Sequence, residues 1–416
     1  MSKKVVIVGG GIIGLCTAYY LEKEGCQITI IDKSNMDSGA SYINAGYITP
    51  SHIIPIASPG MISKGMRYMF NNTSPFYMQP RLDLDFIKWA WYFKKSSTKA
   101  KVESAIPIIK NSNVLSRELF MDIKSSGDLG NFHIERKGLL MLYQTQKEGD
   151  HEMQVAEKAK FNGLEVNHLD ASEIKCIEPN ITINTLGAIH YQCDAHTTPS
   201  DFMARMITYL TAKGVKIYKN EEVIKANFSG NKIDSLLTNK NTHKADEVVF
   251  SAGSWTRDLA KLLNIKLSMQ AGKGYSINVY NDTNISMPAI LMEAKMAVTP
   301  MKGFTRFAGT MEFSGINSKI KKTRVNAIAT NASKFYEGLN ITAEDRSKAE
   351  CGLRPVSPDG LPYIGKYSKY KNLVIATGHA MMGWSLGPLT GKLVTQLIAN
   401  KKTAIDLTSF SPERKF

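Results

Sequence analysis

The chain has 416 residues, which is too long for one ordinary hydrophobic core, so we expect two domains. It contains no run of eighteen apolar residues, which excludes a membrane-spanning helix. The formal net charge of +15 would attract polyanions such as nucleic acid, anionic lipid or acidic metabolites. Because the lysines are spread along the chain, a generally basic surface without a polyanionic partner explains this charge equally well.

Residues 5–32 have the pattern of a strand, a glycine-rich turn, a helix and a second strand. Four β-branched residues at 5–8, without a polar break, are typical of a strand buried on both faces. A helical pattern follows and ends at Gly25, where a helix C-cap needs a positive φ. A second β-branched run at 28–31 then ends in Asp32. This order predicts a βαβ unit.

Gly9, Gly11 and Gly14 have the spacing of a dinucleotide-binding turn. Gly9 allows a tight turn, Gly11 lets a pyrophosphate approach the backbone, and Gly14 lets the helix pack close to the strand. The phosphates would lie at the helix N-terminus, where N–H groups and the dipole favour negative charge. Asp32 would accept hydrogen bonds from an adenosine ribose and argues against a 2′-phosphate. From these residues alone, the ligand could be FAD or NAD, or the segment could be a glycine-rich turn that binds no ligand.

The cysteines are scattered along the chain, and none forms a C-x-x-C pair or a plausible metal set with the histidines, so we expect no metal site. Reduced thiols are typical of a cytoplasmic protein. The first four residues lead directly into the first strand and leave no room for a cleavable signal, which also predicts the cytoplasm. The cysteines are Cys16, Cys26, Cys176, Cys193 and Cys351.

A long irregular stretch and a helical region follow the βαβ unit. Residues 38–60 are rich in small and turn-forming residues, and so long an irregular stretch beside a nucleotide site is expected to line it. Residues 61–126 are helical in character and are expected outside the first domain. Within them, residues 84–95 combine two tryptophans with other aromatics and lysines. The ordinary interpretation is a buried helix with a solvated lysine end, and the alternative is a helix that lies in a membrane interface.

The rest of the chain alternates between strand and helix patterns. From residue 274 to about 329 it changes to successive strands, which are typical of an antiparallel sheet. Strand–helix alternation then returns, so the chain is expected to weave between two discontinuous domains. Strands are expected at 138–143, 164–169, 187–191, 215–218, 222–224, 247–250, 275–280, 289–299, 304–312 and 373–378, and helices at 155–163, 199–210 and 386–399.

Several motifs stand in an order that is specific to one flavoprotein superfamily. Together they resemble the D-amino-acid oxidase superfamily of FAD-dependent oxidoreductases, and the resemblance covers nearly the whole chain. Within it, the closest likeness is to bacterial D-amino-acid dehydrogenases, which share the Ser-x-x-Asn-Ala-Gly loop. The motifs are the N-terminal glycine fingerprint, 41–46, 249–253, 352–365 and 377–384, and further shared segments are 273–276 and 309–312.

The resemblance implies an α/β fold in two parts. One is a Rossmann-like FAD-binding domain with a βαβ unit and a parallel sheet, and the other is an α+β substrate domain with a mostly antiparallel sheet. We expect the FAD-binding domain at 1–60, 164–265 and 350–416. The substrate domain is expected at 61–163 and 266–349.

The resemblance also implies FAD that is bound without a covalent link. Relatives that attach FAD through a cysteine do so near Cys351, which is one place off that position. Val223 would present backbone to the adenine, and N–H groups between residues 378 and 384 would stabilise negative charge on the flavin. The implied FAD-binding residues are Gly9, Gly11, Ile12, Ile13, Gly14, Asp32, Lys33, Ser41, Asn44, Ala45, Gly46, Val223, Ala252, Gly253, Trp255, Gly378, His379, Met381, Met382, Gly383 and Trp384.

In relatives of this kind, the arginine of a Gly-x-Arg-Pro motif clamps the substrate carboxylate, and Arg354 matches it. A planar guanidinium suits a bidentate carboxylate, and a structural salt bridge is the alternative. Tyr275 and His52 are further candidates for catalytic residues, as is Arg306, and each is equally compatible with packing or surface. Arg306 is also the cation nearest to the place where sarcosine oxidases hold a lysine over the flavin.

The implied function is FAD-dependent dehydrogenation of the Cα–N bond of a free amino acid, above all a D-amino acid. The imino acid would hydrolyse to a 2-oxo acid and ammonia, and electrons would pass to a quinone or respiratory acceptor through a peripheral contact with the inner membrane. An oxygen-using amine oxidase of the glycine or sarcosine oxidase type is the alternative. An RNA-modifying flavoprotein and a non-catalytic flavin sensor belong to other classes, and without a basic-aromatic cluster no nucleic-acid partner is expected.

Overall fold

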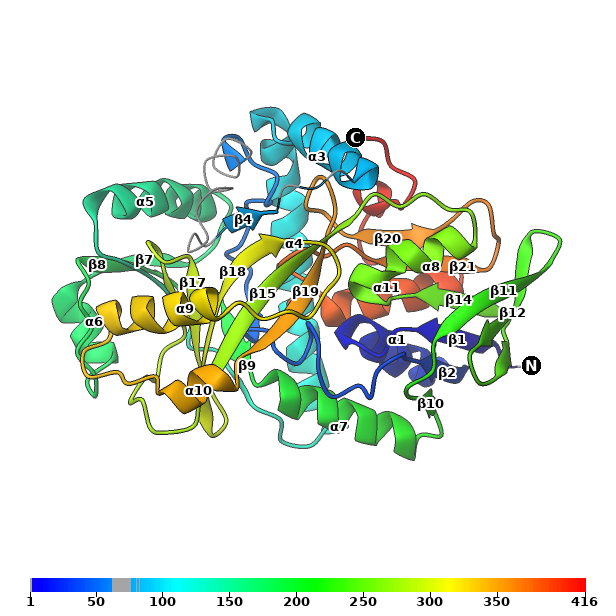
Figure 1. Ribbon diagram of the computed structural model, residues 1–416, viewed down its shortest axis with the longest axis horizontal. Coiled ribbons are helices and arrows are strands. Elements are labelled where there is room, and N and C mark those ends of the chain that lie inside the picture. The colour runs from blue at the N-terminus through cyan, green and yellow to red at the C-terminus, as the bar shows by residue number, and fades with distance from the viewer. Residues whose placement is uncertain (1, 62–75, 80, 82) are drawn as a thin grey trace.

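The computed structural model describes residues 2–61, 76–79, 81 and 83–416, so the predicted helical region at 61–126 lies partly outside the described residues. Within these ranges the first sheet has six strands and is parallel except for its edge strand β20 (Figure 1). Helix α1 (Ile12–Lys23) connects β1 to β2, which confirms the predicted βαβ unit. The strand order is β10 (Lys216–Tyr218), β2 (Gln27–Ile31), β1 (Lys4–Val8), β14 (Glu247–Phe250), β21 (Leu373–Thr377) and β20 (Tyr363–Lys366).

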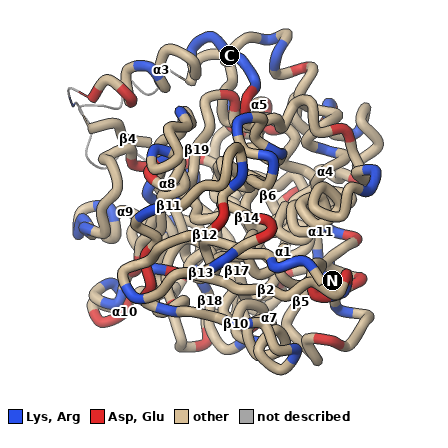
Figure 2. The backbone as a smooth tube through the Cα atoms, turned by 90° about the vertical axis from the view of Figure 1, so that its right-hand side faces the viewer, with Lys and Arg blue, Asp and Glu red and all other residues tan. Residues whose placement is uncertain are grey.

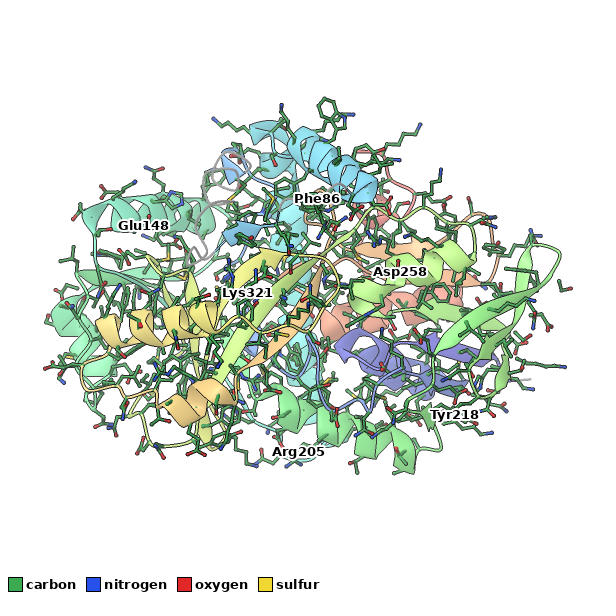
Figure 3. The ribbon with its side chains drawn as sticks, in the orientation of Figure 1. Phe86, Glu148, Arg205, Tyr218, Asp258 and Lys321 are labelled. Carbon is green, nitrogen blue, oxygen red and sulfur yellow. The ribbon has the colours of Figure 1, made fainter. Side chains whose placement is uncertain are left out.

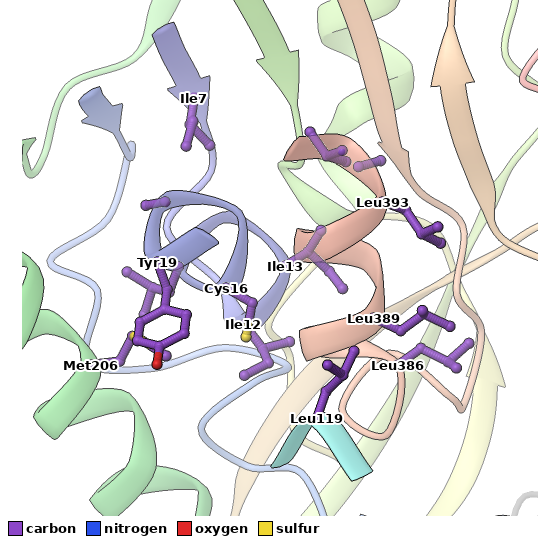
Figure 4. Close-up of a cluster of buried hydrophobic side chains, with 14 of the residues drawn as sticks. Ile7, Ile12, Ile13, Cys16, Tyr19, Leu119, Met206, Leu386, Leu389 and Leu393 are labelled. Carbon is purple, nitrogen blue, oxygen red and sulfur yellow. The ribbon is translucent and has the colours of Figure 1, made fainter. Parts of the chain in front are cut away.

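Helices cover one face of the six-stranded sheet. Figure 4 shows their apolar side chains meeting beside Ile7 of β1. Gly391 permits a close approach of two of these helices, because a Cβ there would lie 2.5 Å from the Cys16 carbonyl. The helices are α1, α4 (Lys99–Ser125), α7 (Pro199–Ala212) and α11 (Gly387–Ile398).

A small sheet and one helix cover the opposite face. Val6 and Val8 of β1 point to this side and pack against Ile233 and Leu236 of the small sheet. The strict alternation of β1 between two apolar cores explains why its sequence has no polar break. The covering elements are β11 (Val223–Ser229), β12 (Lys232–Thr238), β13 (Thr242–Lys244) and α8 (Thr256–Leu262).

The second large sheet has nine strands in the described part of the chain and is mostly antiparallel. Helix α9 (Lys322–Phe335) packs on one core of this sheet, and α5 (Gln146–Phe161) packs on another beside β7 and β8. The order is β19 (Glu350–Val356), β15 (Gln270–Val279), β18 (Phe304–Phe313), β17 (Met296–Met301), β16 (Ala289–Leu291), β6 (Leu139–Tyr143), β8 (Gly187–Tyr191) and β7 (Val166–Asp170), with β4 (Phe76–Met78) beside β18.

A small three-stranded sheet links the two large ones. The Tyr47 hydroxyl donates hydrogen bonds to the carbonyls of Ala289 and Val298 in the nine-stranded sheet. On the other side, Trp384 Nε1 donates to Thr197 Oγ1 over 2.9 Å. The strands are β3 (Tyr47–Ile48), β9 (Ala195–Thr197) and β5 (Ile134–Glu135), and the remaining elements are α3 (Leu84–Ser96), α6 (Ala171–Ile177), α10 (Ala343–Ser347) and the 3₁₀ turns Gly253–Trp255 and Thr408–Phe410.

Several strands join a different sheet from the one that the predicted domain division implies. Strands β7 and β8 pair with β6 in the nine-stranded sheet, although 164–265 was expected in the FAD-binding domain. Strand β19 also joins the nine-stranded sheet, although 350–416 was expected with the FAD-binding domain. Short strands carry no local signal of the sheet they join, since distant partners decide it.

Two further elements differ from their predicted form. Helix α4 was expected outside the first domain, but Leu119 and Phe120 enter the core under the six-stranded sheet. Its N-terminal half contributes Val102 to the core beside α5, β7 and β8, so this one helix packs in two separate cores. The single strand predicted at 289–299 is the hairpin β16–β17. No described helix is long and apolar enough to cross a bilayer.

Candidate active site

A cavity of about 1620 Å³ lies between the six-stranded and the nine-stranded sheet. Pockets for drug-sized ligands are usually about 300–1,000 Å³, so this cavity has room for a dinucleotide and a small substrate together. Its first wall consists of the turns that follow the carboxyl ends of β1, β2, β14 and β21. Its second wall comes from β15, β18 and β19. The carboxyl edge of a parallel sheet is where nucleotides bind in such folds.

The predicted glycine turn forms one end of this cavity. Gly9 has φ of +110°, and a Cβ there would lie 2.6 Å from the Ser251 carbonyl oxygen. A Cβ on Gly14 would overlap the Gly9 carbonyl, so Gly14 allows close packing and does not itself line the cavity. Gly11, Ile12 and Ile13 do line it. The first turn of α1 has no acidic residue, and its N–H groups lack partners within the helix, which suits a phosphate.

Asp32 stabilises this turn as well as lining the cavity. Its Oδ2 accepts a hydrogen bond from the Gly10 N–H over 2.7 Å, and its Oδ1 accepts from the N–H and hydroxyl of Ser34. Lys33 and Trp255 lie at the same end, with Lys33 Nζ 4.2 Å from the centre of the Trp255 ring. Val223, Ala252 and Gly253, which were also predicted to contact the cofactor, line the cavity too.

The predicted loop at 41–46 passes along the cavity. Ser41, Asn44 and Ala45 line it, and Ser41 Oγ accepts a hydrogen bond from the Ile12 N–H at the start of α1. Gly46 does not line the cavity, because its positive φ of +77° turns the chain against the Thr197 carbonyl.

Arg306 holds this loop and does not line the cavity. Its Nη1 donates to the carbonyls of Tyr42 and Asn44, each over 2.7 Å, and its Nε donates to Asn278 Oδ1. Burial lowers the pKa of Arg306 to about 10. These contacts favour the packing interpretation of Arg306 over a place on the substrate side.

The C-terminal motif forms the wall between β21 and α11. His379, Met381, Gly383 and Trp384 line the cavity, whereas Gly378 and Met382 do not. The positive φ of Gly378, +79°, turns the chain under Tyr363. His379 Nε2 lies 2.9 Å from Thr390 Oγ1, and burial lowers the pKa of this histidine to about 3, so the ring is neutral.

Arg354 reaches the cavity from β19. Its Nη1 donates to the Thr310 carbonyl over 3.1 Å, and a Cβ on Gly274 would overlap its guanidinium. Among the described residues, no carboxylate lies within ion-pair distance of Arg354, which argues against the structural salt bridge. Burial lowers its pKa to about 10, so the group is still cationic at neutral pH. An unpaired cation in a cavity wall favours an anionic ligand.

Tyr275 and His52 also line the cavity, and the Tyr275 hydroxyl and His52 Nδ1 have partners in the protein. The Tyr275 hydroxyl donates to Glu312 Oε2 over 2.8 Å. Glu312 is buried among cationic groups that include Lys321, whose place beside the central strands is labelled in Figure 3. His52 Nδ1 lies 3.2 Å from the Ser51 hydroxyl, which donates to Asp194. Burial lowers the pKa of His52 to about 4, so its ring is neutral at pH 7, and raises the pKa of Asp194 to about 7, so this carboxyl is about half protonated at that pH. Their catalytic roles stay predictions.

The sequence analysis missed two residues that position Arg354. Gly274 makes room for the guanidinium and Thr310 accepts its hydrogen bond, with a strained φ of +66°. Both lie in segments that contribute to the family resemblance, so that likeness was the available signal. Their contact with Arg354 depends on the pairing of three strands, which no single segment reveals.

Comparison with known proteins identifies the group to which the chain is related. The profile of the family described as FAD dependent oxidoreductase (DAO) matches residues 4–397. The chain belongs to this family. It is therefore an FAD-dependent oxidoreductase, and the glycine turn, the uncapped start of α1 and the size of the cavity fit FAD. None of the cysteines lines the cavity, and FAD without a covalent link stays a prediction.

Relatives within and around this family match the chain along its full length. It is 29% identical to a D-amino acid dehydrogenase of Helicobacter pylori and 26% identical to one of Neisseria gonorrhoeae, and each match covers 99% of both chains. A crystal structure of glycine oxidase from Geobacillus kaustophilus superposes with a TM-score of 0.77 at 23% identity and covers 100% of both chains. L-proline dehydrogenase from P. horikoshii gives 0.74 at 19% identity, covering 99% of this chain and 97% of its own. These structures establish the fold.

Proposed function

We propose that this protein oxidises the Cα–N bond of a free D-amino acid to an imino acid, which water converts to a 2-oxo acid and ammonia. The observation that carries the proposal is the unpaired guanidinium of Arg354 in the cavity wall. A carboxylate is the planar anion that a guanidinium binds in bidentate geometry. The D configuration is suggested by the names of the relatives from Helicobacter pylori and Neisseria gonorrhoeae.

The protein's contribution to this reaction is positioning and charge. The bond from Nη1 to the Thr310 carbonyl fixes the orientation of the Arg354 guanidinium, which would hold the substrate carboxylate. The nearby positive charge also favours loss of a proton from the substrate ammonium group. A neutral amine is required because only its lone pair stabilises the forming imine. Bound FAD supplies the acceptor for the hydride that leaves Cα.

The first test is the visible flavin spectrum of the holoenzyme under nitrogen. We expect a D-amino acid to bleach the flavin band, while its L-enantiomer and the corresponding amine without a carboxylate leave the band unchanged. The panel should include N-alkyl glycines, since these are substrates of the alternative amine oxidase. Bleaching by none of these compounds would contradict the amino-acid assignment and leave the FAD fold intact. Bleaching by L-amino acids alone would contradict the D assignment.

We further propose that electrons leave through a membrane quinone and that α3 contacts the membrane. The buried face of α3 packs Trp89 against the body of the protein, with its Nε1 donating to the Val356 carbonyl. The opposite face exposes Leu84 (84%), Ile87 (52%) and Trp91 (58%). These positions follow helical spacing, and exposed Lys88, Lys94 and Lys95 accompany them. The buried face agrees with the ordinary interpretation of this segment, and the exposed apolar residues support the proposed membrane contact.

The position of α3 suits an electron acceptor that approaches from a bilayer. Its aromatic residues Trp89 and Phe93 form one apolar cluster with Met311 and Ala380, which line the cavity. Met381 in the same wall is 51% exposed, so the cavity wall reaches the surface close to α3. Ion pairs from Asp85 to Lys261 and Arg257 join α3 to α8, whose Asp258 is labelled in Figure 3. Along the backbone, in the view of Figure 2, basic and acidic residues are interspersed.

The α3 contact is tested with vesicles of anionic phospholipid that contain a ubiquinone analogue. We expect Trp91→Ser to weaken vesicle binding roughly tenfold, since about 1.4 kcal/mol of apolar burial is lost. Phe161→Ser is the matched control, because Phe161 is an exposed aromatic at the end of another helix. Neither change should alter turnover with a soluble dye. Oxygen consumption as fast as quinone reduction would instead identify an oxidase.

A further inference from the structure

Two histidines and a glutamate meet in the small sheet that links the two large ones. Strand pairing sets Glu135 of β5 directly opposite His196 of β9, and His133 immediately precedes β5. His133 Nε2 lies 3.5 Å from Glu135 Oε1, and His196 Nε2 lies 3.8 Å from Glu135 Oε2. One ligand atom from each of the three side chains falls within 4.8 Å of the others.

The nitrogen atoms that face this cluster are available for a ligand. His196 has no exposed surface, and neither of its ring nitrogens has a hydrogen bond of normal geometry within the described residues. His133 uses Nδ1 for Thr198 Oγ1 at 2.8 Å, which leaves Nε2 directed at Glu135. A hydrogen bond to one ring nitrogen is how proteins orient a histidine that binds a metal through the other. The Pro300 backbone also contacts the His196 ring, and a buried imidazole nitrogen without a well-formed hydrogen bond gains from a ligand that offsets its desolvation.

The spacing of these atoms fits a small divalent cation. Tetrahedral zinc has bonds of about 2.0–2.2 Å to nitrogen and oxygen, so its ligand atoms lie about 3.4 Å apart. The observed 3.5 and 3.8 Å, which run to the two oxygens of Glu135, are close to this value, and the three ligand atoms, all within 4.8 Å of one another, would draw together around an ion. Two imidazoles and one carboxylate are a donor set for Zn²⁺ and related transition ions. We propose that His133 Nε2, Glu135 and His196 Nε2 bind one Zn²⁺ ion and leave a fourth position for water.

The surrounding charges are compatible with such an ion. Burial lowers the pKa of His196 to about 4 and also lowers that of His133, so both rings are neutral, the form that binds a metal. Lys137 Nζ lies 2.8 Å from Glu135 Oε2 and competes for that oxygen. Both of these side chains are partly exposed, so Lys137 can turn to solvent at little cost.

A metal here would connect segments that are far apart in the sequence. It would fasten the residues before β6 to β9, whose Thr197 accepts the indole hydrogen bond of Trp384 in the cavity wall. The ion would lie outside the cavity, since none of its three ligands lines it. A role in fixing the joint between the two sheets therefore fits better than a part in the redox reaction.

The test is zinc binding by the full-length holoenzyme after treatment with a chelator and dialysis. We expect calorimetry to give one Zn²⁺ per chain, and the thermal midpoint to rise with free zinc. His133→Gln and Glu135→Gln should each weaken binding at least tenfold, because each removes one of three protein ligands. Both positions are partly exposed, so these variants remain useful if His196→Gln does not fold.

His168→Gln is the matched control, since it removes an exposed imidazole at a distant edge of the nine-stranded sheet. It should bind zinc as the unaltered protein does and show the same rise of the thermal midpoint. The proposal is overturned if the unaltered protein binds no zinc. It is equally overturned if Glu135→Gln and His133→Gln bind zinc as tightly as the unaltered protein, because the ion then lies elsewhere.

Discussion

Arg354→Leu is expected to lower kcat/KM for the amino acid roughly 100- to 1,000-fold while the protein still folds and binds FAD. Removing one partner of a buried, hydrogen-bonded charge pair costs about 2–5 kcal/mol, or roughly 30- to 5,000-fold in rate, and the expected loss lies in the middle of this range. The fold should tolerate the change, because the arginine has no described carboxylate partner and the substitution removes an unpaired cation. Steady-state kinetics with a saturating dye acceptor measure the effect.

Arg354→Lys separates charge from geometry at the same position. An ammonium group keeps the charge but cannot form two parallel hydrogen bonds to a carboxylate. We therefore expect an intermediate loss, of about tenfold to a hundredfold, that falls mainly on KM.

A comparison of substrates provides the internal control for Arg354. The unaltered enzyme should prefer a D-amino acid over its uncharged amide, and Arg354→Leu should lose this preference. Arg306→Leu removes a buried arginine from another strand of the same sheet, where it holds the loop carbonyls of Tyr42 and Asn44. That variant should keep the preference even if its FAD affinity falls. Full preference for the acid in Arg354→Leu would show that another group binds the carboxylate.

Local sequence patterns were sufficient for the parts of the fold that depend on neighbouring residues. The βαβ unit could be predicted because β1 is apolar on both faces and Gly14 packs against Gly9 within the same unit. Arg354 could be identified because it is the arginine of the Gly-x-Arg-Pro motif. The structure adds that its side chain lies in the cavity wall, where it can contact a ligand.

Features that depend on distant pairing could not be predicted in the same way. The place of β8 in the nine-stranded sheet is set by β6 and β7, and the role of Arg306 is set by carbonyls in a loop far away in the chain. The group of His133, Glu135 and His196 was missed for the same reason, and the expectation of no metal site considered only sets that include a cysteine. Its ligands come together only when β5 pairs with β9.

Gly11→Asp is expected to weaken FAD binding at least 100-fold without destabilising the protein that lacks FAD. Gly11 is the N-cap of α1 with φ of −73°, so any residue can adopt its conformation. The nearest atom to an added Cβ is Ser41 Oγ at 3.1 Å, which requires only a small shift. Aspartate is a preferred N-cap and satisfies N–H groups of the first turn. The same carboxylate would stand where the cofactor phosphates approach, and two like charges in contact cost several kcal/mol.

Gly11→Asn is the control that isolates the charge, because asparagine has the same shape and caps a helix equally well. It should weaken FAD binding about tenfold through bulk alone, and Gly25→Asn at the other end of α1 should have no effect, since nothing lies within 4 Å of a Cβ there. Quenching of FAD fluorescence by the apoprotein gives the affinities, and thermal unfolding without FAD gives the stabilities. Equal losses in Gly11→Asp and Gly11→Asn would mean that the side chain only obstructs the cavity. An unchanged affinity in both variants would place the phosphates away from the start of α1.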